Sequence, residues 1–119
     1  MTLEDRIWSA VEPRIYISRE EYFEALSAWA VTPLADVGAV MVRGPEFHFV
    51  TWGKANFTRS DIREVLAPII AEHGRVETKT PVDDLRMQRF NRAIGFTSTG
   101  SDEFFVYFAL TRAPFSRKT

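Results

Sequence analysis

Few side chains in this 119-residue chain could carry out chemistry, and they are scattered. There is no cysteine, which excludes disulfides, thiol nucleophiles and thiolate metal ligands. The two histidines, His48 and His73, stand apart in the sequence, whereas a metal site usually needs three or four ligands. We therefore predict no metal site, with His48 on a strand face and His73 near the C-terminal end of a helix.

Two further groups have alternative interpretations. Ser98, Thr99 and Ser101 flank Gly100 in a predicted polar loop, but no histidine lies near them in the sequence to activate a nucleophile. Arg86, Arg89 and Arg92 recur every third residue and could contact the phosphates of a nucleic acid. A net charge of −1 favours a solvated helix surface instead, so we expect no nucleic-acid partner.

The elements that position these residues follow from apolar periodicity and capping signals. Their order is helix, helix, strand, strand, helix, strand, helix, strand, which predicts an α/β or α+β fold with helices packed on a mixed sheet. The chain is long enough for one domain, residues 1–119, and too short for two. We predict helices over 2–11, 18–30, 61–74 and 82–94, and strands over 37–42, 47–52, 75–80 and 102–112.

Two of these elements carry specific expectations. Pro68 removes a backbone donor in the middle of the third helix, so we expect a kink or a break there. The last strand is apolar on both faces, which predicts a central strand covered on both sides. The three tryptophans, Trp8, Trp29 and Trp52, are predicted to be core or interface anchors.

The stretch FNRAIGF, residues 90–96, joins the fourth helix to the last strand through Gly95. Together with the preceding residues it forms DLRMQRFNRAIGF, which resembles a helix pattern of the GNAT acyltransferase superfamily, with Phe90, Gly95 and Phe96 in register. The order of elements over residues 37–112 is also similar to the C-terminal half of that family. The resemblance implies a GNAT-like, mostly antiparallel mixed sheet flanked by helices.

The phosphate-binding loop departs from the family. There, a glycine-containing loop at a helix N-terminus holds the pyrophosphate of acyl-CoA through backbone N–H groups. Phe57, Ser60 and Ile62 stand at the three family positions, and none of them matches. Lys54, Arg59 and Ser60 are the residues left to bind acetyl-CoA, if it binds.

The catalytic position departs as well. Asn91 stands where the family carries a tyrosine that protonates the departing thiolate, and an amide has no proton to give near neutral pH. We therefore predict a structural or surface role for Asn91 and name no catalytic residue. We place Glu46 and Glu77 near the sheet centre, where a GNAT enzyme could keep a base. The favoured interpretation, however, is that Glu46 is an acidic residue of a turn and Glu77 an acidic residue on the solvent-facing side of a strand.

These departures favour a GNAT-like protein that binds another protein without acyl transfer and without a cofactor. Small GNAT-like tailed-phage proteins have a similar length and ending, which suggests virion or head assembly, or inhibition of a host protein. The alternative is an acetyl-CoA-dependent N-acyltransferase with a degenerate CoA loop, and homo-oligomerisation stays open. No apolar run reaches the roughly 18 residues needed to cross a bilayer, and no signal peptide is recognisable, so we expect no membrane partner and a location in the cytoplasm or a virion.

Overall fold

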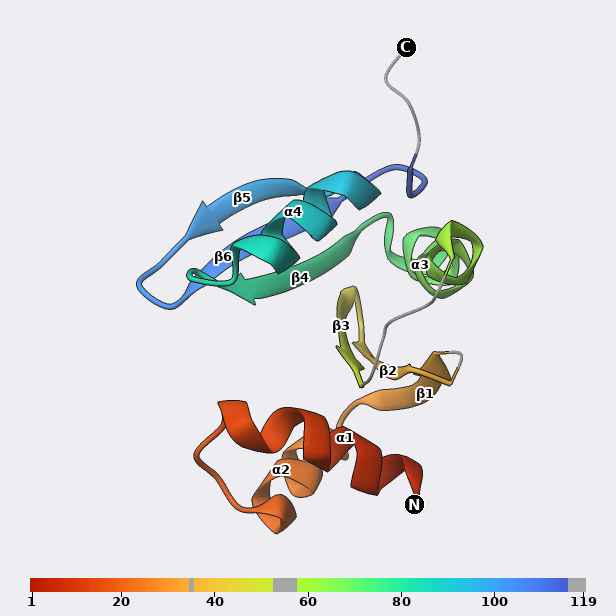
Figure 1. Cartoon of the computed structure of the whole chain (residues 1–119). Coiled ribbons are helices and arrows are strands. Elements are labelled where there is room, and N and C mark those ends of the chain that lie inside the picture. The colour runs from red at the N-terminus through yellow and green to blue at the C-terminus, as the bar shows by residue number, and fades with distance from the viewer. Residues whose placement is uncertain (35, 53–57, 116–119) are drawn as a thin grey trace.

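The computed structural model describes residues 1–34, 36–52 and 58–115. It is an α+β fold with one six-stranded mixed sheet in the order β1-β2-β3-β4-β6-β5 (Figure 1). Neighbouring strands are antiparallel except for β3 and β4, so the predicted fold class is confirmed. The helical elements are α1 (Leu3–Val11), η1 (Glu12–Arg14), α2 (Arg19–Leu26), α3 (Arg59–His73) and α4 (Leu85–Ile94), and the strands are β1 (Ala30–Leu34), β2 (Gly38–Arg43), β3 (Glu46–Thr51), β4 (Val76–Pro81), β5 (Thr97–Ser101) and β6 (Phe105–Leu110).

Helices cover the two faces of the sheet unequally. On one face, α3 and α4 form the main core, where Leu66 and Ile94 meet strand residues such as Phe47 and Phe108. On the other face, α1 and α2 pack over the first three strands through a smaller core centred on Ile7. In Figure 1, α1 and α2 lie beside β1–β3, and α4 lies over β4–β6.

Several predicted boundaries and one predicted face are wrong. The second helix ends at Leu26 rather than at residue 30, because the chain then enters β1, which pairs with β2. Helix α4 begins at Leu85, since Asp84 caps it by accepting the backbone N–H of Met87. In β6, the strand is central as predicted, but Tyr107 is 37% exposed on a face that α1 and α2 do not reach. Strands β1 and β5 were not expected; both are edge strands of the sheet.

Pro68 does not break α3, which runs without interruption from Arg59 to His73. Pro68 and Glu64, whose carbonyl loses a helical donor, are both exposed, so water can take the place of the missing N–H. The helix ends at Gly74, which adopts a left-handed conformation with φ of 75°.

The parallel contact between β3 and β4 is short. It consists of the single pair Glu46–Glu77, reinforced by a 2.7 Å hydrogen bond from the Glu77 N–H to the Pro45 carbonyl. By contrast, β4 and β6 are paired from Val76 to Pro81. The two halves of the sheet therefore separate beyond Glu46 and Glu77, which creates a gap within the sheet.

Candidate functional site

A pocket of about 170 Å³ lies where β3 and β4 separate, and we call it the divergence pocket. Strand residues from both sides of the gap line it, together with the first turns of α4 and one residue of η1. It thus brings together segments from both halves of the chain. Its lining residues are Arg14, His48, Phe49, Thr78, Lys79, Thr80, Pro81, Asp84, Met87 and Asn91.

Asn91 forms part of the inner wall of this pocket and is 2% exposed. Its amide nitrogen donates a 2.8 Å hydrogen bond to the hydroxyl of Thr80 on β4. One turn earlier, the buried amide of Gln88 donates to the carbonyls of Pro81 and Val82. Because a buried amide costs free energy unless it is hydrogen-bonded, these contacts fix α4 against the end of β4.

Glu46 and Glu77 are brought side by side as the pair that joins β3 to β4. Each carboxylate nevertheless has its own basic partner. The Oε2 atom of Glu46 lies 2.6 Å from Nε2 of His48, and Oε1 of Glu77 accepts a 2.8 Å hydrogen bond from Nε of Arg75. The Glu46 and His48 side chains are each 29% exposed, so the pair is accessible to a small reactant.

The pairing of His48 with Glu46 was not predicted, although the sequence holds a signal for it. Residues two apart on a strand project from the same face, and Glu46 and His48 satisfy that spacing on β3. The ring of Trp29 completes the group, at 5.4 Å from the His48 ring and 4.5 Å from the Arg43 guanidinium. A carboxylate that accepts from an imidazole can orient it for proton transfer, so this is the arrangement in the described residues most suited to acid–base chemistry.

Of the expected cofactor-binding residues, Arg59 and Ser60 lie at the start of α3, whereas Lys54 falls outside the described residues, as does Phe57. Thr58 caps the helix by accepting the backbone N–H of Asp61, and the Asp61 carboxylate accepts the Thr58 N–H at 2.8 Å. The Asp61 carboxylate in this first turn opposes the binding of a phosphate there, whereas Arg59, the first residue of α3, would favour it. Ser60 lies in this first turn, within α3.

The other two residues singled out in this region, Arg59 and Ile62, each contact another part of the protein. The Arg59 guanidinium lies 5.1 Å from the centroid of the Phe115 ring, and Arg63 stands at 5.4 Å from the same ring. Ile62 is 3% exposed and packs in the main core. Its branched side chain is thus a core contact rather than an obstacle above the helix end.

The remaining candidates are separate from the divergence pocket. The hydroxyl-rich segment 97–101 forms the exposed edge strand β5, and Arg86 and Arg89 are exposed on α4. Within the described part of the chain, no three His, Cys, Asp or Glu side chains gather where they could hold a metal ion. Nor does any helix in those ranges have the length and apolar character required to cross a membrane.

Comparisons of the chain with protein-family models, with curated proteins and with solved structures find no match.

Proposed function

We propose that this protein is a small GNAT-like domain that works by binding another protein and does not transfer acyl groups. The observation that carries this proposal is an exposed apolar surface at one end of the sheet, formed by Val82, Leu85 and Phe104. Their exposed fractions are 45%, 62% and 65%. Large apolar side chains that share an exposed surface commonly mark a protein interaction site.

These residues are held close to one another by the fold. The Val82 N–H donates a 2.9 Å hydrogen bond to the Phe104 carbonyl, which joins the end of β4 to the start of β6. Leu85 is the first residue of α4 and follows in the same turn. We call this group the Val82–Phe104 surface.

Two further features support binding over acyl transfer. Asn91, at the position of the family's tyrosine, is buried and hydrogen-bonded as a structural residue. The start of α3, where the family holds pyrophosphate, carries the Asp61 carboxylate. The small tailed-phage proteins that the chain resembles suggest the setting, namely virion or head assembly or the inhibition of a host protein.

Site-specific photocrosslinking tests the proposal. A benzophenone-bearing phenylalanine analogue replaces Phe104 in one sample and Ala25, an exposed residue of α2, in the control. In the native cell, we expect one protein to crosslink at position 104 and not at position 25. The proposed surface would be excluded if both positions gave the same crosslinked proteins, or none.

An acetyl-CoA-dependent N-acyltransferase is the second candidate, and the Glu46–His48 pair beside the divergence pocket favours it. Isothermal titration with acetyl-CoA separates the two functions. For the binding domain, we expect no affinity tighter than about 0.1 mM, which is several kcal/mol weaker than micromolar binding. A saturable micromolar signal that desulfo-CoA competes away would favour the enzyme instead.

A further inference from the structure

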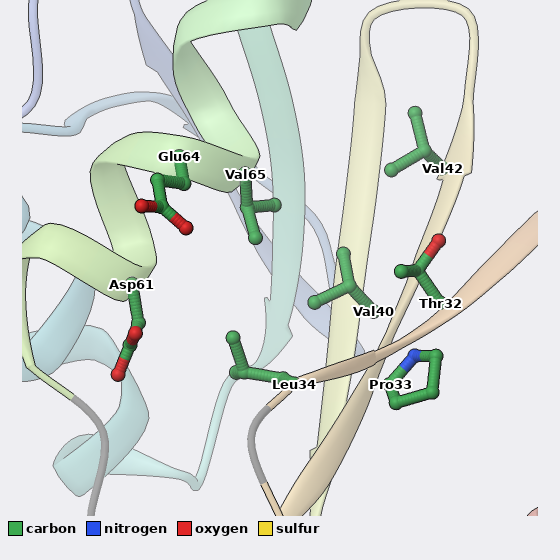
Figure 2. Close-up of a pocket in the computed structure, with 8 residues that line it drawn as sticks. All are labelled: Thr32, Pro33, Leu34, Val40, Val42, Asp61, Glu64 and Val65. Atoms are coloured by element: carbon green, nitrogen blue, oxygen red, sulfur yellow. The ribbon is translucent and has the colours of Figure 1, made fainter.

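A second pocket, of about 380 Å³, lies between the first turns of α3 and strands β1 and β2 (Figure 2). We call it the α3 pocket. Its floor belongs to the main core, since Leu34 is 4% exposed and Val40 is 3% exposed. Figure 2 shows Val65 of α3 and Val40 of β2 projecting into the space between the helix and the strands.

The charged side chains that line this pocket are both acidic, and both come from α3. Asp61 and Glu64 line it from α3, and Thr32 lines it from β1. The eight lining residues, all of them described, include no basic side chain. The α3 pocket therefore combines an apolar floor with a negatively charged wall.

The two carboxylates differ in the hydrogen bonds and salt bridges that they form with described residues. Asp61 accepts the Thr58 N–H through Oδ2, which leaves its second oxygen for another donor. Glu64 is exposed and forms no salt bridge with any described residue. Like charges three residues apart on a helix repel each other, and a cation between them would remove that repulsion.

We propose that the α3 pocket receives a basic side chain, lysine or arginine, from the partner protein. The methylene stem would pack on Val40 and Val65, and the cationic group would lie between Asp61 and Glu64. Long basic side chains suit such a site because their stems are apolar and their heads are charged. This inference rests on the proposed protein-binding function.

The edge strand beside the pocket favours insertion of a side chain over addition of a strand. Pro33 of β1 has no N–H to donate to an added strand, and proline on an edge strand opposes such pairing. The charge complementarity of the pocket, rather than free backbone groups, thus selects the partner segment.

Methyl NMR on the isolated protein tests this proposal with two matched peptides. One is acetyl-Ala-Leu-Lys-Leu-Ala-amide, and the other carries norleucine in place of lysine, which keeps the stem and removes the charge. We expect the lysine peptide to shift the methyl signals of Val40, Val42 and Val65 and to bind ~3-fold or more tightly than the norleucine peptide, as a partly exposed ion pair provides.

Glu64→Gln should remove that preference, whereas Glu72→Gln, an exposed site near the other end of α3, should retain it. Equal binding of the two peptides, the absence of shifts at millimolar peptide, or an equal effect of the two variants would overturn the proposal. A free alkylammonium ion that binds as tightly as the lysine peptide would overturn the assignment to a partner side chain.

These measurements are independent of the crosslinking test. The α3 pocket is built from α3, β1 and β2. The Val82–Phe104 surface lies elsewhere, where β4 ends and where β6 and α4 begin. If the peptide titration fails, the α3 pocket does not bind a basic side chain of the partner. The crosslinking result at position 104 would be unchanged by that failure.

Discussion

The side-chain amide of Asn91 donates a 2.8 Å hydrogen bond to the hydroxyl of Thr80, and each of these residues is 2% exposed. The contact joins α4 to β4 beside the divergence pocket. Because both side chains are almost fully buried, loss of this hydrogen bond would leave a buried polar group without its partner. Asn91 is therefore expected to act through stability.

Asn91→Ala should destabilise the fold by about 2 kcal/mol, because the Thr80 hydroxyl loses its buried donor and a cavity forms. Asn91→Tyr should also destabilise it, by about 1–3 kcal/mol, since a larger ring must fit a filled site. Urea unfolding followed by circular dichroism measures both free energies of unfolding. Arg89→Ala, an exposed change on the same helix, is the control and should stay within about 0.5 kcal/mol of the wild type.

A double-mutant cycle isolates the contact itself. Thr80→Val and Asn91→Leu should each be destabilising, whereas the double variant should lose about 1 kcal/mol less than the sum of the two. The reason is that an apolar pair leaves no buried polar group without a partner. Additive losses in urea unfolding would show that the two side chains do not stabilise each other.

Gly95 and Phe96 make the joint between α4 and β5 sensitive to substitution. Gly95 has a φ of 124°, and a Cβ atom there would lie 3.3 Å from Cδ1 of Leu110. Gly95→Val should cost more than about 1 kcal/mol through backbone strain. Phe96 is 2% exposed, so Phe96→Ala should cost about 3 kcal/mol. Both variants should melt well below Arg89→Ala; a wild-type melting temperature for Gly95→Val would contradict the backbone conformation at this joint.

The N-terminal cap of α1 should contribute to stability in a pH-dependent manner. The Thr2 backbone N–H and the Arg19 guanidinium donate to the Asp5 carboxylate, and these bonds lower its pKa from 3.8 to about 2. Since the pKa is lower in the folded state, this stabilisation is present above pH 3.8 and is lost as the pH falls toward 2. Carbon-detected NMR titration should give the low pKa, and Arg19→Gln should raise it. An unchanged pKa in that variant would exclude a contribution from the ion pair.

A second carboxylate organises the start of β6, next to the Val82–Phe104 surface. The hydroxyl of Tyr107 and the backbone N–H groups of Phe104 and Phe105 donate to Asp102, and together they lower its pKa. Tyr107→Phe removes the largest of these effects, so the pKa of Asp102 should rise. Crosslinking at position 104 should persist in that variant, because the two backbone bonds still hold the turn. Loss of the crosslink without unfolding would place Tyr107 in the interface itself.

The sequence by itself determined the elements whose signals are local. Thr2 and Asp5 form the capping box of α1, Gly74 and Gly95 end helices, and Gly44 turns the chain between β2 and β3. Each of these features depends on backbone conformation and on hydrogen bonds between residues a few positions apart. The α+β class could therefore be predicted from the order of such elements.

Only the tertiary structure decided what depends on partners distant in the chain. The polar segment Thr97–Ser101 is a strand because β6 supplies its hydrogen bonds, and Ala30–Leu34 is a strand because β2 does. Asn91 is buried because Thr80 on β4 faces it, and Tyr107 is exposed because α1 and α2 stop short of β6. The α3 pocket likewise exists only where a helix and two strands meet. Pairing and burial are set by the neighbour that a residue meets in the fold, and a residue's own type and spacing do not specify that neighbour.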